Sequence, residues 1–561
     1  MTDPILAART AVEQAAIQAA KSASQPKTKL KPRIGPIRYN LEAFGVAILG
    51  AVLLKWFCLE AFQIPTSSMQ PTLMGSSEAG VYDRLLVDKL TPAIREPQRW
   101  DVTVFGYPLQ QNQNYVKRLV GLPGETLFIG GGNLYRVTQD GTKRTYEPLR
   151  KPDRIQQGLW KEIYPARQLL HEGQKGLGGM LYGTPTQAWS EGSELGAFTV
   201  ALEPVAGRVY KLQFKDNVDG GFVDRVWDGY PTSTAQAIRE KAGMRECEIV
   251  PDARITATVR PEQTLDELAL EVEVRRPGLP MTTFSLLVQG GKAKLMAQRG
   301  NEPAIESPSF VFELPPGVAT EVGFAHLDDE LIAWRDGDVA QRFDVSSHDC
   351  RDACEIQGGG TGATGDHASA PQLRLKGAGK VHIEGLRIDR DLHYTKRGFS
   401  YAQDLIPIPD GKYFMMGDNT LQSIDSRGWT SIDIGRLADG TAVTPDEAKA
   451  RAAEGARVLR GNKRPMPASM QKDRDETPIV IRSKDALAMI DEFGEIHALK
   501  GRGLVDEQTG KFTIEPPTTG EGQKAWEPPE DWHGFVKREH IRGRALLIFW
   551  RWPFPRMSPI R

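Results

Sequence analysis

The sequence is poor in cysteine and close to neutral in charge. Four cysteines among 561 residues exclude a small fold built on disulfides. The 71 Lys and Arg residues nearly balance 72 Asp and Glu residues, so the charge balance does not indicate a nucleic-acid partner. The chain is too long for a single hydrophobic core, and we expect roughly three or four domains.

The cysteines do not form a recognisable metal site. Cys350 and Cys354 are close in sequence, but His348 is the only other soft ligand nearby, and zinc requires more ligands. A local disulfide and two free thiols both remain open. The glycine-rich segment 358–365 lacks the Lys-Ser/Thr pair of a phosphate-binding loop and is typical of a linker. We therefore predict neither a metal nor any other cofactor.

One hydrophobic run, residues 40–62, has the length of about 20 residues that a membrane helix requires. By the positive-inside rule, the basic segment before it places residues 1–39 in the cytoplasm and everything after residue 62 outside. The alternative is a buried helix of a soluble domain. Five basic residues with no acidic residue between them form that segment: Lys27, Lys29, Lys31, Arg33 and Arg38.

A serine-rich stretch, residues 62–73, follows the hydrophobic run directly. Small hydroxyl residues between Pro65 and Pro71 indicate a rigid turn that exposes a serine beside apolar neighbours. A serine is a weak nucleophile and needs a base. The alternative is a linker that leaves a membrane helix.

A compact antiparallel β pattern follows over residues 84–129. In the segment 114–120, alternation places Lys117 on a strand between apolar side chains. Desolvation there favours the neutral amine, which could act as a base for Ser68 without a histidine. The ordinary alternative is a solvated lysine at a sheet edge.

Two further regions differ from this pattern. Residues 150–379 contain short β-rich segments separated by Gly and Asp turns at the spacing expected of a β-sandwich. The segments 224–229 and 330–337 look like a repeated strand-turn signature that resembles concanavalin- or laminin-G-like jelly rolls, and the alternative is two similar hairpins. Residues 431–531 form a polar insertion, in which Thr444 begins a capped helix.

A second polar constellation occupies residues 417–429. Its Gly-Asp-Asn start is a strong turn signal. The turn alone does not require the Ser-x-Asp-Ser-Arg that follows, in which the Asp425 carboxylate can pair with the Arg427 guanidinium.

Four segments, in order, resemble the characteristic boxes of bacterial type I signal peptidases, membrane-bound Ser/Lys endopeptidases that remove signal peptides from exported proteins. They are residues 68–73, residues 82–89, residues 101–105 together with 115–124, and residues 417–429.

The resemblance implies a role for each matching residue. Ser68 would be the nucleophile, Lys117 the general base and Ser423 the residue that orients the lysine. The Thr66 hydroxyl and the Ser68 N–H would form the oxyanion hole. Asp425 and Arg427 would form a supporting ion pair. Four apolar residues would line pockets that select small side chains, typically Ala-x-Ala, before the cut: Phe62, Ile64, Leu73 and Val116.

Several positions depart from the family pattern. Residues 420–422 read Thr-Leu-Gln where Arg-Asp-Asn is typical, which puts the loop geometry around Ser423 in question. Tyr82, Glu125 and Thr430 replace a usual Gly, Asp and Gly respectively.

We thus predict a mainly β protein, in which a signal-peptidase-type β core lies behind one transmembrane helix and carries an inserted β-sandwich. Its partners would be signal peptides of exported preproteins and membrane lipid, with no nucleic acid, in the cytoplasmic membrane. The alternative is a membrane-anchored binding protein that uses the sandwich and has a dormant peptidase core. The predicted parts after the anchor are the core in residues 63–149, 380–430 and 532–561, and the insertions 150–379 and 431–531.

Overall fold

The computed structural model describes most of the chain. The described residues are 14, 15, 18, 36–77, 79–165, 180–205, 207–214, 250–275, 280–346, 368–395, 405–462, 479–483, 486–505, 512–515, 530–552 and 557–560. Outside them lie the basic residues 27–33, Cys247, Cys350 and Cys354, and the segments 224–229 and 358–365.

The N-terminal unit contains one candidate membrane helix. Helix α2 (Pro36–Leu53) continues into a π-helical turn, η1 (Leu54–Cys58). The stretch Asn40–Cys58 is long and apolar enough to cross a membrane, and none of it is buried within the protein. The helix ends at Cys58 rather than at residue 62, because the next residues form strand β1 (Leu59–Gln63) by pairing with β3 (Val81–Asp88). Glu60 on this strand forms an ion pair with Lys89.

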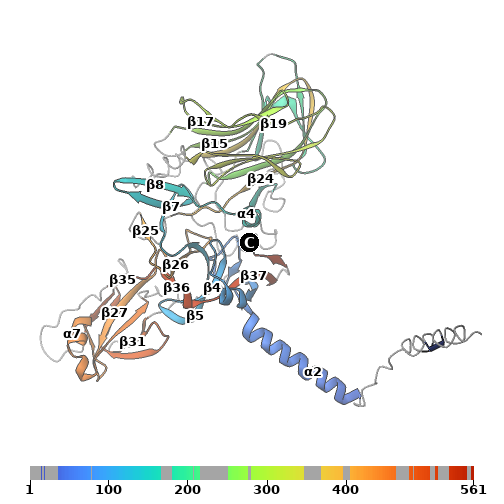
Figure 1. The fold of residues 1–561 in the computed structure, drawn as a ribbon. Coiled ribbons are helices and arrows are strands. Elements are labelled where there is room, and N and C mark those ends of the chain that lie inside the picture. The colour runs from blue at the N-terminus through green and yellow to red at the C-terminus, as the bar shows by residue number, and fades with distance from the viewer. Residues whose placement is uncertain are drawn as a thin grey trace, which may run out of the picture. The chain divides into compact units, whose positions relative to one another are not determined.

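The core of the second unit is a nine-stranded sheet built from distant parts of the chain (Figure 1). Strand β37 (Ile541–Trp552) lies between β3 and β4 (Val102–Tyr107) and pairs with both. In hydrogen-bonding order the main strands are β1, β3, β37 (Ile541–Trp552), β4 (Val102–Tyr107), β5 (Gln110–Gly121), β26 (Lys412–Met416) and β36 (Phe535–Lys537), and β2 (Gly75–Ser76) and β38 (Ser558–Pro559) pair at its side.

Alternation of side chains explains how this sheet forms. In β3 every second residue is buried, and Leu85 and Val87 point into an apolar cluster with Val102 and Val104 of β4. A smaller sheet extends the core and consists of β25 (Ile406–Pro407), β6 (Thr126–Gly130), β7 (Asn133–Asp140) and β8 (Lys143–Pro148).

The first insertion is a β-sandwich, as predicted. Its two eight-stranded sheets share one apolar core. One sheet has the order β10 (Leu181–Thr184), β13 (Tyr210–Phe214), β23 (Ala368–Gly377), β15 (Leu265–Arg275), β16 (Thr282–Gln289), β17 (Lys292–Arg299) and β18 (Ile305–Glu306), with β19 (Phe310–Val311) beside β17. The other has β11 (Trp189–Glu191), β12 (Phe198–Leu202), β24 (Gly379–Arg390), β14 (Ala253–Pro261), β20 (Thr320–Leu327), β21 (Glu330–Arg335) and β22 (Asp338–Asp344), with β9 (Lys161–Tyr164) beside β24.

The sandwich extends beyond its expected end at residue 379. Strand β24 pairs with β12 and β14 and therefore belongs to the sandwich, although its residues 380–390 were assigned to the peptidase core. The chain leaves the sandwich after Arg390. Helix α4 (Asp153–Leu159) lies before β9, on the way into the sandwich.

The second insertion is a smaller β region. Its helix α7 (Pro445–Ala450) begins as predicted, because the Thr444 hydroxyl accepts a hydrogen bond of 3.3 Å from the Glu447 N–H. Its strands form three sheets: β28 (Ala442–Val443), β27 (Thr430–Arg436), β29 (Arg457–Asn462) and β35 (Glu530–Trp532); β30 (Ile479–Ser483), β31 (Ala486–Ile490) and β32 (Ile496–Lys500); and β33 (Arg502–Val505) with β34 (Phe512–Glu515).

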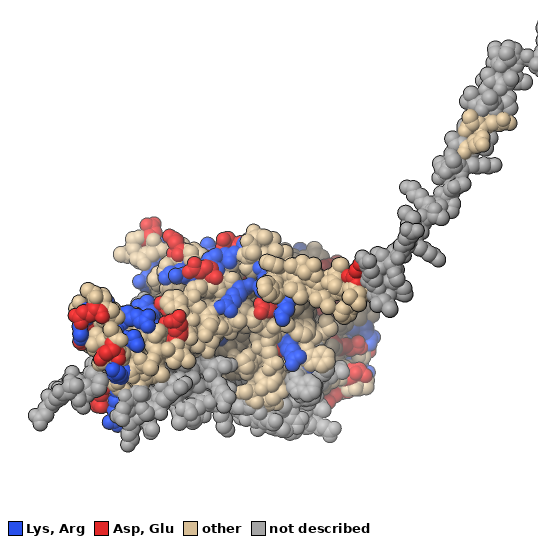
Figure 2. Space-filling model, turned by 90° about the horizontal axis from the view of Figure 1, so that it is seen from below, with Lys and Arg blue, Asp and Glu red and all other residues tan. Residues whose placement is uncertain are grey.

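Charged residues of both signs are interspersed on the face of the molecule in Figure 2. This is the distribution expected of a nearly neutral chain.

Candidate active site

The site forms where the loop after β1 meets strand β5 and the segment after β26. Ser68 lies in that loop, and its backbone is held by the turn that follows β26. The Asn419 N–H donates to the Ser68 carbonyl over 3.1 Å, and the Asn419 side-chain amide donates to the Ser67 carbonyl over 3.1 Å. The loop that carries the serine is therefore fixed by a residue far away in sequence.

Lys117 contacts Ser68 directly. Its Nζ lies 2.5 Å from Ser68 Oγ, and only 4% of the lysine is exposed. Strand β5 sets this position, because Lys117 pairs with Thr103 of β4 in the middle of the sheet. The ring of Tyr115, two residues earlier on the same face, lies 5.7 Å from the lysine Nζ. The structure thus brings together the two residues predicted to form the dyad.

Asp425 and Arg427 form the predicted ion pair. Arg427 Nε lies 2.8 Å from one oxygen of Asp425 and Nη2 lies 2.8 Å from the other. Both residues are buried, and the Gly417 N–H adds a hydrogen bond of 3.0 Å to Asp425. Burial opposes the charge on Asp425, but the attraction of Arg427 leads the effects that hold its pKa below the ordinary value, and Lys117 contributes.

Gly417 allows the parts of the site to approach one another. A Cβ at this position would lie 2.1 Å from Ser423 Oγ and 2.3 Å from the Ser68 carbonyl oxygen, too close for any side chain. The glycine of the Gly-Asp-Asn turn is therefore required by packing against the nucleophile loop.

Ser423 lies in the site without the hydrogen bond that was expected of it. Its side chain is completely buried beside Gly417, yet its Oγ has no hydrogen-bond partner in the described part of the chain. Lys117 Nζ is directed to Ser68 instead. The orienting function of Ser423 stays a prediction.

Thr66 lies beside the nucleophile. Its Oγ1 is 3.5 Å from Ser68 Oγ, and the residue is exposed. A hydroxyl here can reach an oxygen bound next to Ser68, and its place in an oxyanion hole stays a prediction.

The four predicted pocket residues lie in one apolar cluster. Ile64 and Leu73 are buried in it, whereas Phe62 and Val116 are partly exposed at its border. Leu73 has no exposed surface and can form only the base of a pocket, so direct contact with a substrate falls to the partly exposed members.

A second buried ion pair, which no sequence pattern indicates, joins Arg118 to Asp418. Arg118 points to the opposite face of β5 from Lys117 and forms two hydrogen bonds with Asp418, of 2.9 and 2.7 Å. Burial opposes the charge on Arg118, but Asp418 raises the pKa of the guanidinium above its ordinary value. Arg118 Nη1 also donates to the carbonyl of Trp100, whose φ of 75° is unusual for a bulky residue.

One of the departures from the family pattern is accommodated by a specific contact. Glu125 replaces an Asp, and both of its carboxylate oxygens bind Arg99 Nη2, at 2.5 and 2.7 Å. The longer side chain of Glu125 therefore forms an ion pair with Arg99.

Two groups of acidic and imidazole side chains among the described residues have the spacing of metal ligands. Asp252, Asp328 and Asp391 form one, but Lys151 Nζ lies 2.6 Å from Asp328 and 2.7 Å from Asp391 and takes the place of a cation. The other group, residues 491–497, is a hairpin turn held by its own hydrogen bonds.

The fold and the Ser68–Lys117 contact define a β protein with a serine–lysine site, in a chain whose N-terminal unit contains a candidate membrane helix. The family model described as signal peptidase, peptidase S26 matches residues 37–170 and 363–444. The gap between the two matched segments falls on the sandwich, as a large insertion requires.

Curated relatives give the same result. A signal peptidase I of Leptolyngbya laminosa is 32% identical over 157 residues, which cover 27% of this chain and 69% of the relative. The signal peptidase I of Pseudomonas aeruginosa is 42% identical over 103 residues, covering 16% of this chain and 34% of the relative. One from Pseudomonas fluorescens is 37% identical, covering 20% of this chain and 45% of the relative. The chain belongs to the signal peptidase I family.

Solved structures match the sandwich only loosely. An alginate lyase is 9% identical with a TM-score of 0.24 and covers 36% of this chain and 84% of its own. A carbohydrate-binding module from Bacillus subtilis is 6% identical with a TM-score of 0.21 and covers 36% and 90%.

Proposed function

We propose that this protein is a membrane-bound serine endopeptidase that removes N-terminal signal peptides from exported preproteins. The observation that carries the proposal is the 2.5 Å contact between Lys117 Nζ and Ser68 Oγ. A neutral lysine at this distance can accept the hydroxyl proton as Ser68 attacks a carbonyl carbon, and can then activate water to release the acyl group. This contact favours an active peptidase over a binding protein with a dormant core.

The remaining site residues support the reaction in the proposal. The Thr66 hydroxyl and the Ser68 N–H stabilise the oxyanion, and Asp425 with Arg427 holds the loop that carries Ser423. Phe62 and Val116 border an apolar surface suited to small side chains in the substrate, with Ile64 and Leu73 beneath it. We infer cleavage after small residues of the Ala-x-Ala type.

The experiment is the processing of a preprotein by the detergent-solubilised full chain. A preprotein whose signal ends in Ala-x-Ala should be cut once, directly after the last alanine. A matched preprotein with leucine at that alanine should be cut slowly or not at all, because the larger side chain does not fit the shallow apolar border. Equal cutting of both would contradict the proposed specificity.

Replacing Ser423 with alanine is expected to lower the cleavage rate by about 10²-fold without lowering stability. The Ser423 hydroxyl is buried without a partner in the described residues, so its removal costs no folding contact there. Steady-state cleavage and thermal unfolding of the same preparation measure the two effects. Unchanged cleavage would show that Ser423 does not orient the lysine during the reaction.

We also propose that Asn40–Cys58 spans the cytoplasmic membrane once, with the N-terminus in the cytoplasm and the catalytic part outside. In spheroplasts, an epitope at the C-terminus should be removed by added protease. An epitope at the N-terminus should be removed only after lysis. The reverse pattern would refute this topology.

A further inference from the structure

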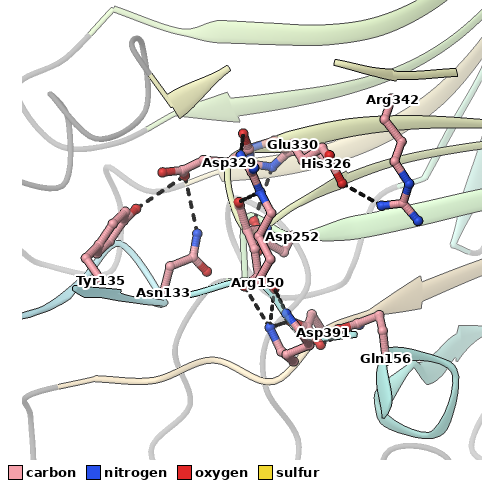
Figure 3. A network of polar contacts seen from close by, with 12 residues as sticks. Asn133, Tyr135, Arg150, Gln156, Asp252, His326, Asp329, Glu330, Arg342 and Asp391 are labelled. Atoms are coloured by element: carbon pink, nitrogen blue, oxygen red, sulfur yellow. Dashed lines mark hydrogen bonds and ion pairs between the residues drawn. The ribbon is translucent and has the colours of Figure 1, made fainter. Parts of the chain in front are cut away.

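The sandwich inserts a hairpin tip into the peptidase core. Asp328 and Asp329 connect β20 to β21 with φ of 46° and 58°, the left-handed region in which Asn and Gly are usual. Contacts with the core hold this conformation. Asp328 binds Lys151 at 2.6 Å. Asp329 accepts hydrogen bonds from Asn133 over 3.4 Å and from Tyr135 over 3.2 Å (Figure 3).

The same lysine ties the tip to the point where the chain leaves the sandwich. Lys151 also binds Asp391, the first residue after β24, at 2.7 Å, and Gln156 of α4 donates to Asp391 over 2.8 Å. Burial and the neighbouring carboxylates raise the pKa of Asp328 to about 6, against the attraction of Lys151. Removing one partner of a buried ion pair lowers the free energy of unfolding strongly. The ion pairs of Lys151 therefore fix the point at which the chain leaves the sandwich.

The exit segment, residues 391–395, continues from this junction to the catalytic loop. The Tyr394 N–H donates to the Gly132 carbonyl over 2.9 Å, which anchors the segment to the core. The Thr420 hydroxyl then donates to the His393 carbonyl over 2.6 Å, and Arg427 Nη1 donates to the Thr395 carbonyl. Two side chains of the catalytic loop thus bind backbone oxygens of the segment that leaves the sandwich.

Thr420 stands where the signal peptidase pattern has an arginine. It is 1% exposed, and its own carbonyl accepts a hydrogen bond of 2.7 Å from Arg427 Nη2. The residue therefore connects the exit segment to the Asp425–Arg427 pair beside Ser423. The departure from the pattern coincides with the hydrogen bond from the Thr420 hydroxyl to the exit segment.

We propose that Thr420 is a positioning residue through which the inserted sandwich fixes the catalytic loop of residues 417–428. The sandwich then helps to hold the catalytic loop in place, whether or not it also binds a ligand. This inference rests on the proposed peptidase function for its effect on rate, but the effect on loop order does not depend on it.

The first test compares Thr420→Val with Thr420→Ser in the full chain. Valine keeps the shape and loses the hydroxyl, so we expect kcat to fall by about tenfold with KM unchanged, because the lost hydrogen bond supports the catalytic loop and Thr420 is not part of the apolar cluster proposed to bind the substrate. Serine should restore most of kcat. The matched control is Thr199→Val, which removes a sandwich hydroxyl 3.2 Å from His382 and should leave kcat unchanged.

Amide hydrogen exchange of the same proteins gives a readout without catalysis. Thr420→Val and Asp328→Asn should both raise exchange in residues 418–428, and Asp328→Asn should also raise it in residues 391–395. Thr199→Val should change neither segment. If the wild type fails to cut preproteins, the proposed function is wrong. Amide hydrogen exchange in residues 418–428 would still show whether Thr420 positions the catalytic loop. Unchanged exchange in residues 418–428 in both variants, or a Thr420→Ser variant as slow as Thr420→Val, would overturn the inference.

Discussion

Lys117→Met is expected to lower preprotein cleavage by about 10⁴-fold or more while the protein remains folded. Methionine has a similar length and suits the buried position, but it offers no amine to accept the proton of Ser68, 2.5 Å away in the wild type. Single-turnover cleavage by detergent-solubilised protein measures the loss. Thermal unfolding of the Lys117→Met variant tests whether the fold is kept.

The matched control for this variant is Lys143→Met. Lys143 is an exposed lysine on β8, and its replacement should leave cleavage unchanged. Cleavage by Lys117→Met at a rate close to the control would mean that another group activates Ser68, and the dyad would be wrong.

Asp418→Asn is expected to lower the thermal unfolding midpoint of the catalytic part by roughly 10 °C, because breaking a buried ion pair costs about 3–5 kcal/mol. Neither side chain of the Arg118–Asp418 pair is exposed, so the variant leaves a guanidinium charge without its partner in the interior. Cleavage should fall as well, since Arg118 follows Lys117 directly on β5 and Asn419 follows Asp418. Scanning calorimetry and steady-state cleavage measure the two effects.

An exposed ion pair provides the control. Asp446 binds Lys449 at 3.0 Å on α7, but both side chains are largely exposed. Such pairs contribute about 0–1 kcal/mol, so Asp446→Asn should shift the midpoint little. Equal shifts for the two variants would show that the buried pair does not stabilise the core.

Those residues of the site that belong to a short sequence pattern could be predicted from the sequence. Alternation places Lys117 on a strand, and the Ser-x-Asp-Ser-Arg pattern indicates that the Asp425 carboxylate can pair with the Arg427 guanidinium. The pairing of Arg118 with Asp418 could not be predicted, because the two residues are 300 positions apart and Gly-Asp-Asn indicates only a turn. A local sequence pattern does not indicate which distant charged residue will pair with a charged residue on a strand.

The mainly β fold and the inserted sandwich were predicted correctly, but two boundaries moved for physical reasons. Gly377 and Gly379, both with positive φ, look like the end of a domain, yet they form the turn that carries the chain from β23 in one sheet of the sandwich to β24 in the other. Residues 59–62 continue the hydrophobic run but form a strand, because they pair with β3. Composition alone does not separate the end of a helix from the start of a strand. The support of the catalytic loop by residues 391–395 arises only from tertiary contacts.

We propose that Ser68 is the nucleophile that cuts signal peptides. This is tested by the N-terminal sequence and yield of the product formed from an Ala-x-Ala preprotein by the wild type, Ser68→Ala and Ser67→Ala. Ser67 is the adjacent serine and serves as the matched control. We expect one product, beginning after the last alanine, from the wild type and Ser67→Ala, and none from Ser68→Ala. The same product from Ser68→Ala at the wild-type rate would contradict it.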